Sequence, residues 1–324
     1  MHPKHFQPSF WSEHRRSLLI VGLVVLVGLG GTWEFQNRQA LSAKTPATAT
    51  RPTVTPRQIT TRQQKLKHQL QTYADHVTAD KTTSISFYNL SPLPGSAAAK
   101  HATTRRFYHQ GDLAVNANAH TPEVSASTYK LFMAAYVLNL HHQGLLPWTP
   151  ENQTGFEQMI VHSENDFAED LLDRQGLPAV NAFIGAQHWY APVFTAGIPS
   201  QTTAYSLNLA LQDLALQKAP FAHQADRKWL LNLMGKQVYR TGIPAGAAQA
   251  KAGTTVADKV GWYADTNNDA GIVTLPNGQR YILVVMTHGH MQSGFSGFPR
   301  IAKITTHIQK LVYDPQLDRQ LNPS

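Results

Sequence analysis

Two residues at the start of an apolar helix have the types and the spacing for nucleophilic catalysis. Ser127 and Lys130 lie three positions apart in STYKLFMAAYVLN, so a helix places their side chains on one face, one turn apart. A serine hydroxyl becomes a nucleophile when a neighbouring group takes its proton, and a lysine does so only in its neutral form. The chain has no cysteine, so its nucleophile must be oxygen or nitrogen. Because an ordinary lysine pKa is about 10.4, Lys130 needs burial or a second cation.

A Ser-x-x-Lys pair also arises by chance, and two further motifs add specificity. The segment MIVHSENDFAEDLL contains Ser163 and Asn165 in a Ser-x-Asn pattern. A Lys-x-Gly pattern occurs twice, at Lys251 in a Gly/Ala-rich loop and at Lys259 in a predicted strand. On a strand, a cation and the edge backbone can both face a substrate. We therefore assign Lys259 and Gly261 to the site and keep Lys251 as the alternative.

Hydrophobic periodicity predicts the elements that must position these motifs. Strands are expected at 85–90, 256–263, 270–275 and 281–287. Helices are expected at 62–79, 127–139, 153–173, 203–217 and 225–235, followed by a last amphipathic helix with Ile301, Ile304, Ile308, Leu311 and Val312 on one face. This order predicts an α+β fold: an antiparallel sheet built from both chain ends, with helices packed on it and a helical insertion.

An uncharged apolar run, Ser17–Trp33, precedes the folded region. As a helix it is about 26 Å long, close to the hydrocarbon core of about 30 Å. The basic residues before it orient the N-terminus towards the cytoplasm. We expect a cytoplasmic tail at 1–16, a transmembrane signal-anchor at 17–35, a Thr/Pro-rich stalk at 36–61 and an extracytoplasmic folded domain at 62–324. The alternative is a cleaved signal peptide and a secreted protein.

The distribution of charge argues against nucleic acid as a partner. The net charge is +8, from 28 Lys and Arg against 20 Asp and Glu. Most of the excess lies before residue 81, where it suits a membrane or an anionic cell wall. The histidines at 141–142 and 288–290 are interpreted as surface residues, because no HExxH pattern or carboxylate cluster accompanies them. We expect a monomer without metal or cofactor.

Together the motifs resemble a known family. SASTYKLFMAAYVL, MIVHSENDFAEDLL and VADKVGWYADTNNDAGIV, followed by YILVVMTHG, are similar to the class A β-lactamase and penicillin-binding-protein superfamily, whose signature is S-x-x-K, S-D-N and K-T-G. The three motifs follow the family's order, and the likeness covers about residues 82–313. It implies a β-lactamase-like fold and a membrane-anchored serine hydrolase that acts on β-lactams or on peptidoglycan peptides ending in D-alanine.

The resemblance implies catalytic roles for four residues. Ser127 is the acylated nucleophile, and Lys130 accepts its proton or assists it electrostatically. Ser163 passes a proton to the leaving nitrogen. Lys259 supplies positive charge near Ser163 and near the substrate carboxylate.

The resemblance also implies how the substrate is bound. Asn165 holds the amide side chain of the substrate, and the backbone amides of Ser127 and Trp262 form the oxyanion hole. The substrate backbone pairs along the strand that contains Lys259, Gly261 and Trp262.

Four departures from the family pattern bear on turnover. Glu164 replaces the middle aspartate of S-D-N, and a longer acid can still hold that loop. Val260 replaces the hydroxyl residue of K-T-G, which predicts weaker binding of a substrate carboxylate, by about 1.5–3 kcal/mol. Residues 174–212 contain no Asp or Glu that would match the hydrolytic glutamate of the family, so slow deacylation is expected. The short interval between Ser127 and Ser163 suggests a trimmed helical lobe.

Two other functions remain open at this stage. One is a sensory or binding module that acylates once, or binds muropeptide, without turnover. The other is a structural wall-associated domain with a relic site. The acidic residues Asp166, Glu169, Asp170 and Asp173 are interpreted as a solvated helix face.

Overall fold

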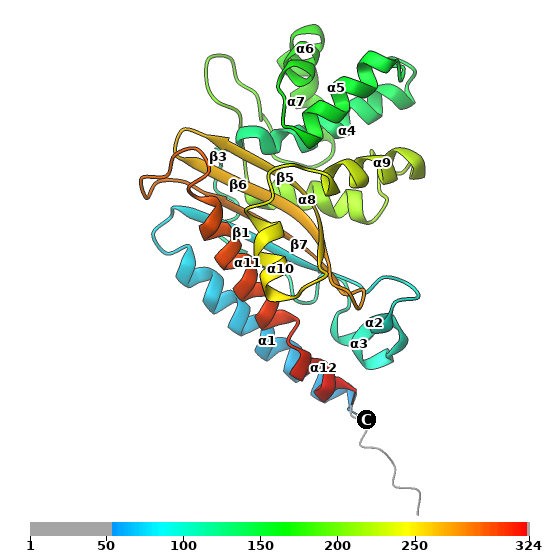
Figure 1. Cartoon of the computed structure of the whole chain (residues 1–324), viewed down its shortest axis with the longest axis vertical. Helices are drawn as coiled ribbons and strands as arrows, with labels where there is room; N and C mark the ends of the chain where they lie inside the picture. The colour runs from blue at the N-terminus through cyan, green and yellow to red at the C-terminus, as the bar shows by residue number, and fades with distance from the viewer. Residues whose placement is uncertain (1–53, 323–324) are drawn as a thin grey trace, which may run out of the picture. The chain divides into compact units, whose positions relative to one another are not determined.

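A five-stranded antiparallel sheet forms the centre of the computed structural model, which describes residues 54–322 (Figure 1). The strands run in the order β2-β1-β7-β6-β5. Their bounds are Val115–Ala117 for β2, Thr83–Leu90 for β1, Arg280–Thr287 for β7, Thr266–Thr274 for β6 and Thr255–Tyr263 for β5. Because Ile85 of β1 pairs with Val285 of β7, the sheet joins both ends of the domain. The predicted α+β arrangement is therefore confirmed.

The predicted N-terminal segments fall mostly outside this part of the chain. The cytoplasmic tail, the signal-anchor and residues 36–53 of the stalk lie before residue 54. The end of the predicted stalk, residues 56–61, is not a stalk but the start of helix α1. Within residues 54–322, no helix combines the length and the hydrophobicity needed to cross a bilayer. The anchor stays a prediction from the sequence.

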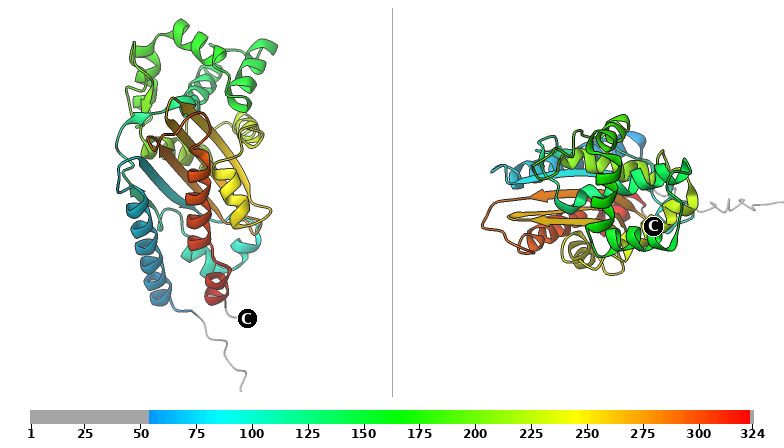
Figure 2. Two further views of the ribbon diagram at one scale, coloured as in Figure 1. Left: turned by 60° about the vertical axis from the view of Figure 1, so that its left-hand side comes forward. Right: turned by 90° about the horizontal axis from the view of Figure 1, so that it is seen from above.

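One face of the sheet is covered by α1 (Pro56–Val77), α10 (Ile243–Ala250) and α11 (Phe298–Val312). In Figure 1 and in the left view of Figure 2, α1 and α11 lie side by side. The isoleucines of α11 recur with helical spacing, so one stripe is buried against the sheet. These helices share a hydrophobic cluster with Val260 of β5 and Tyr281 of β7. Short helices complete this end of the domain: α2 (Ala97–Lys100), α3 (Ala102–Phe107) and α12 (Pro315–Leu321).

The opposite face carries the helical insertion. Its helices are α4 (Lys130–His142), α5 (Pro150–Val161), α6 (Asp166–Gln175), α7 (Leu177–Ala186), α8 (Ala204–Ala215) and α9 (Gln224–Gly235). Residues 130–138 of α4 are all buried, so α4 is a central helix of this layer rather than an amphipathic cover. The 3₁₀ turn η1 (Ala126–Tyr129) leads into it, and the two-stranded pair β3 (Glu123–Val124) and β4 (Gln201–Thr202) lies beside that turn.

Four predicted elements differ from the structure. The helix expected at 127–139 begins at Lys130, after the turn η1. The helix expected at 153–173 is two helices, because Ser163 adopts a left-handed backbone with φ +64° between α5 and α6. Strand β6 begins at Thr266 instead of 270, since buried Asn267, Asn268 and Asp269 hide its start from a hydrophobicity pattern. The first helix begins at Pro56 instead of 62; Thr55 caps it, and its hydroxyl accepts from the Gln58 amide at 3.3 Å.

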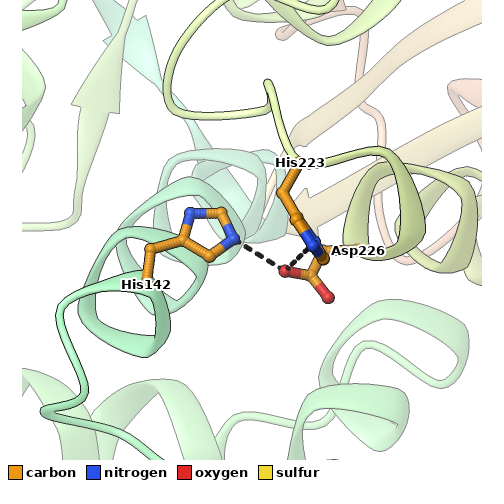
Figure 3. A group of neighbouring side chains, drawn as sticks. All are labelled: His142, His223 and Asp226. Carbon is orange, nitrogen blue, oxygen red and sulfur yellow. Dashed lines mark hydrogen bonds and ion pairs between the residues drawn. The ribbon is translucent and has the colours of Figure 1, made fainter.

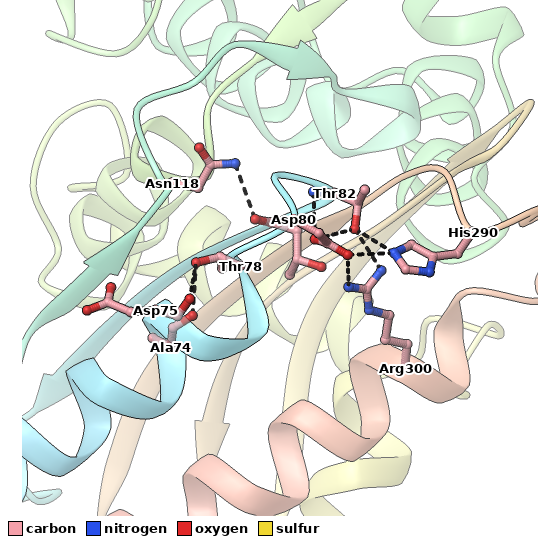
Figure 4. Close-up of polar contacts among 9 residues, drawn as sticks. Ala74, Asp75, Thr78, Asp80, Thr82, Asn118, His290 and Arg300 are labelled. Atoms are coloured by element: carbon pink, nitrogen blue, oxygen red, sulfur yellow. Dashed lines mark hydrogen bonds and ion pairs between the residues drawn. The ribbon is translucent and has the colours of Figure 1, made fainter.

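A polar cluster fixes the junction between α1 and β1 (Figure 4). The Asp80 carboxylate accepts from the Thr82 amide at 3.0 Å and from its hydroxyl at 2.8 Å. It also pairs with His290 Nε2 at 2.8 Å and with Arg300 of α11 at 3.7 Å. These hydrogen bonds, first of all that from the Thr82 backbone, hold the pKa of Asp80 well below its usual value.

Candidate active site

Ser127 lies on the 3₁₀ turn η1, one turn before α4, and not in the α-helix that the sequence predicted. Ala126, just before it, has φ +43°, a strained backbone for a residue with a Cβ. Two contacts hold this turn in place. The Thr128 hydroxyl donates to Ser125 O at 2.6 Å, and Asn268 Nδ2 of β6 donates to Ser125 O at 3.1 Å. The strained turn keeps Ser127 partly exposed while its neighbours are buried.

Lys130 is fully buried, and its side-chain nitrogen is within hydrogen-bond distance of three oxygens. Nζ lies 3.0 Å from Ser127 Oγ, 2.6 Å from Ser163 O and 2.6 Å from Asn165 Oδ1. A neutral amine has two N–H groups and one lone pair. The carbonyl of Ser163 and the amide oxygen of Asn165 accept both N–H groups, so the lone pair is left for the Ser127 hydroxyl proton. The geometry suits both forms of Lys130: the ammonium donates to all three oxygens, and the neutral amine donates to two and accepts the Ser127 proton.

The environment of Lys130 favours that neutral form. Burial lowers its pKa to about 8, although the negative charges of Glu169 and Glu164 act in the opposite direction. A pKa near the working pH is what a general base needs. The sequence-based requirement for a lysine with a lowered pKa is thus met by burial.

Ser163 lies between the two lysines of the site. Its hydroxyl accepts from Lys259 Nζ at 2.8 Å, and its carbonyl accepts from Lys130. The left-handed backbone at Ser163 turns both groups towards the lysines, since a helical residue would aim its carbonyl along the helix axis. Lys259 also donates to Val260 O at 3.0 Å. This arrangement gives a proton path from one buried lysine to the Ser163 hydroxyl.

Lys259 is completely buried on β5, and its pKa is lowered well below the usual value. Burial is the main cause, and the charge of Lys130 adds to it. Asp258 and Asp269 oppose this effect, and burial in turn raises the pKa of both carboxyls, that of Asp269 to about 7. Arg240 pairs with Asp258 at 2.7 Å.

Gly261 permits β5 to approach the nucleophile's turn. A Cβ at this position would lie 2.7 Å from Ser127 N, 2.8 Å from Thr128 N and 3.0 Å from Ser125 O. All three are backbone atoms, so no side chain could move aside. The turn lies over the face of the sheet where β5 and β6 are paired, since η1 contacts both strands. The structure therefore brings the predicted substrate strand against Ser127.

Val260 points the other way. Successive strand residues alternate between faces, and Val260 is fully buried in the cluster that includes α10 and α11. Trp262 shares that parity and packs on Tyr239 and Phe295, with ring centroids 4.7 Å and 4.8 Å away. The Val260 side chain is therefore not among the groups that line the cleft beside Ser127.

An open cleft of about 470 Å³ gives access to Ser127. It is lined by Val124, Ala126, Ser127, Tyr129, Asn165, Glu169, Gly197, Ile198, Pro199, Ser200, Trp262 and Tyr263. Lys251, the alternative lysine, ends α10 and is exposed in a different hollow beside Pro276 and Asp318. Lys259 thus joins Ser127, Lys130, Ser163 and Asn165, whereas Lys251 does not.

The sequence missed two residues of this site. Asn268 donates to Val124 O at 2.8 Å as well as to Ser125 O, and it holds the chain just before Ser127. It pairs in register with Gly261, which a strand assignment starting at 270 could not show. Glu169 was interpreted as part of a solvated helix face, but it lines the cleft with Ser127. Its position six residues after Ser163 follows only from the break between α5 and α6.

Comparison with known proteins adds independent information. Residues 151–315 match the family described as "Beta-lactamase enzyme family". A search of curated proteins found no significant match. The solved structures that resemble this chain include PBP-A, with 20% identity over 77% of this chain and 96% of that one, at a TM-score of 0.59.

Two further structures show the same fold at similar distance. A PBP-A variant, solved as an acyl-enzyme complex with penicillin G, is 19% identical over 79% of this chain and 97% of that one, at a TM-score of 0.59. A β-lactamase from Sphaerobacter thermophilus is 18% identical over 75% of this chain and 95% of that one, also at 0.59. With its family match over half of its length and a serine-lysine site in an open cleft, the chain belongs to the beta-lactamase enzyme family, as a serine hydrolase.

Proposed function

We propose that this protein is a membrane-anchored, extracytoplasmic serine hydrolase that forms an acyl-Ser127 intermediate with β-lactams or D-alanyl peptidoglycan peptides. The observation that carries the proposal is the position of Lys130 Nζ, 3.0 Å from Ser127 Oγ, with its two other hydrogen bonds already made. The acyl-enzyme of a PBP-A variant with penicillin G supports the substrate class.

The acylation step uses both lysines. Neutral Lys130 takes the Ser127 proton as Oγ attacks the carbonyl carbon, and the amides of Ser127 and Trp262 stabilise the oxyanion. The C–N bond then breaks. The leaving nitrogen takes a proton from the Ser163 hydroxyl, which is reprotonated through Lys259. Asn165 and the edge of β5 hold the substrate amide and backbone.

Intact-mass analysis tests acylation directly. Incubation of the purified chain with penicillin G should add the mass of one penicillin, and Ser127→Ala should abolish the adduct. Thr128→Ser, which keeps the hydroxyl that braces the turn, should still form it and serves as the matched control. Failure of the wild-type chain to form an adduct with any penicillin or with a D-alanyl peptide ester would refute the proposal.

Slow deacylation is the second part of the proposal. Residues 174–212 carry no Asp or Glu, and the cleft wall at Gly197–Ser200 is neutral. Glu169 is the acidic residue that lines the cleft, so it is our candidate for activating the hydrolytic water. There, Glu169 takes a proton from water and the hydroxide attacks the acyl carbon. The bond from the acyl carbon to Ser127 Oγ then breaks, and Oγ takes back the proton that Lys130 accepted during acylation.

The neutral cleft wall at Gly197–Ser200 also favours a second function, that of a non-turnover sensor. If Glu169 does not activate water, the cleft lining has no other acidic residue to do so, and the acyl-enzyme is not hydrolysed. Steady-state assays with a chromogenic cephalosporin separate the two functions. Continued product release identifies an enzyme, whereas one equivalent followed by arrest identifies a sensor.

The anchored location rests on the apolar run Ser17–Trp33. Fractionation of cells that express the full chain should place it in the membrane, and external protease should digest the catalytic domain in spheroplasts. Removal of residues 1–35 should release the protein into the soluble fraction. Recovery of the mature chain in the medium, shortened at its N-terminus, would instead support a cleaved signal.

A further inference from the structure

Three side chains of metal-ligating type, His142, His223 and Asp226, converge in the helical layer of the domain (Figure 3). His142 ends α4, and His223 and Asp226 lie at the start of α9. His142 Nε2 is 2.7 Å and His223 Nδ1 is 2.9 Å from the same oxygen, Asp226 Oδ2. All three donor atoms lie within 4.8 Å of one another. None of these residues lines the Ser127 cleft or takes part in the acylation step.

The donor set fits a transition-metal ion. Imidazole nitrogen and carboxylate oxygen are ligands of Zn²⁺, which accepts three protein ligands and a water. Zn²⁺ with bonds of about 2.0–2.1 Å spaces its ligand atoms about 3.3 Å apart. The His–Asp separations are slightly shorter than this, so small rotations of the side chains open enough room. Mg²⁺ and Ca²⁺ prefer all-oxygen sites and do not match.

The burial pattern favours a bound cation over a plain hydrogen-bonded pair. Asp226 is 10% exposed at its side chain, whereas His142 is 33% and His223 is 57% exposed. The carboxylate is thus held inside while the two imidazoles form an open rim, which leaves a position for a water ligand. Elsewhere, His109 and Asp112 form a simple pair at 3.3 Å with both side chains exposed. The convergence of two imidazoles on one buried oxygen is a different arrangement.

We propose that His142, His223 and Asp226 form a Zn²⁺ site that links the end of α4 to the start of α9. Lys130 begins α4, and α9 contacts β5, which carries Lys259. A metal at this junction therefore ties α4, which carries Lys130, to α9, which packs against the strand of Lys259. It stabilises the folded state by binding it and not the unfolded chain.

Zinc titration of the tag-free full chain tests the site. After treatment with a chelator, isothermal titration with Zn²⁺ should show one equivalent in the wild-type chain, and its affinity should fall at least tenfold in Asp226→Asn. This variant keeps an oxygen that accepts both imidazole hydrogen bonds, so it is expected to fold. His142→Ala and His223→Ala should lose the same equivalent. The other histidines can bind metal, so the readout is the difference between wild type and each variant.

Thermal unfolding gives a second readout that does not depend on enzyme activity. A saturating excess of Zn²⁺ should raise the Tm of the wild-type chain by about 5 °C or more, and Mg²⁺ should leave it unchanged. His109→Ala, which breaks a histidine–carboxylate pair outside the proposed site, should behave as wild type in both experiments. Equal Zn²⁺ binding by wild type and Asp226→Asn would overturn the proposal, as would an equal shift with Mg²⁺ or loss of the equivalent in His109→Ala.

Discussion

The two faces of strand β5 perform different tasks with neighbouring residues. Lys259 and Gly261 lie on the face towards the active site. Lys259 donates to the Ser163 hydroxyl, and Gly261 lets the strand contact the turn that carries Ser127. Val256 and Val260, of opposite parity, are buried in the cluster with α10 and α11. Residue parity in this strand therefore separates chemistry from packing. Substitutions on the first face should alter the reaction, and those on the second should alter stability.

The largest expected effect comes from a glycine on the chemical face. Gly261→Ala places a Cβ 2.7 Å from Ser127 N, so β5 or the turn must shift. A displacement of about 1 Å at reacting groups costs about 100-fold in rate, and we expect at least that loss in the acylation rate with penicillin G, measured by stopped-flow or quenched intact mass.

Gly271→Ala is the matched control on the other face. Gly271 pairs with Asp258, and its Cβ would meet side-chain atoms of Asp258 at 3.0 Å and Val256 at 3.2 Å. We expect a lower Tm with an acylation rate close to wild type in the protein that remains folded. Equal losses of rate in the two variants would break the comparison between the faces.

The pH dependence of acylation tests whether Lys130 is the general base. Because the pKa of Lys130 is lowered to about 8, the acylation rate should rise about tenfold per pH unit below pH 8 and level off above it. A rate that falls as pH rises towards 8 would contradict Lys130 as the base.

The lowered pKa of Lys130 also makes the stability of the folded chain depend on pH. Between about pH 8 and 10.4 the unfolded chain holds a proton that folded Lys130 has lost, so the free energy of unfolding should increase with pH.

Substitution of Glu169, which lies on α6 and lines the cleft beside Ser127, tests the deacylation step. If it activates the hydrolytic water, Glu169→Gln should slow release of the penicilloyl group by tenfold or more. Acylation should not slow, since removing this negative charge favours neutral Lys130. Asp170→Asn, at the next position of α6 and outside the cleft lining, is the control. Unchanged release in Glu169→Gln would show that Glu169 does not activate the hydrolytic water.

The sequence could predict the motif residues because their chemistry demands particular types. Ser127 and Lys130 share a face at helical spacing, and the choice of Lys259 over Lys251 followed from its place in a strand. The structure brings Lys259 to Ser163, although the roles of these residues still rest on the experiments above. The sheet was predictable as well, since β1, β5 and β7 are rich in apolar residues.

What the sequence could not predict depends on long-range polar contacts. Asn268 is buried because it donates to Val124 and Ser125, 144 and 143 residues earlier, and no local pattern marks such a partner. The break at Ser163 depends on a left-handed backbone that is stabilised by the two lysines around it. The convergence of His142 with His223 and Asp226 brings together the end of α4 and the start of α9, which are far apart in the chain.

Val260→Thr tests the packing face directly. The sequence predicted that a hydroxyl here would strengthen binding of a substrate carboxylate by about 1.5–3 kcal/mol, but the side chain lies in an apolar cluster. A buried hydroxyl without a partner costs about 1–3 kcal/mol. We therefore expect a lower free energy of unfolding in urea and little change in acylation. An increase in acylation of tenfold or more would show that the hydroxyl reaches the substrate, and that parity does not separate the two tasks here.

The smallest expected effect lies where the packing helices meet the end of the sheet. Asp80→Asn weakens the contacts with His290 and Arg300 that join the start of β1 to α11. The pKa of folded Asp80 is lowered, so its contribution is fully present above the unfolded pKa of about 4 and is lost as pH falls from there through the lower, folded pKa. Because this carboxylate is 46% exposed, solvent screens its pairs and we expect a loss of only about 0.5 kcal/mol near neutral pH. Urea unfolding should show a smaller difference between wild type and variant at pH 3 than at pH 7. An equal difference at the two pH values would mean that the amide disturbs the turn at Thr82 rather than the charge pairs.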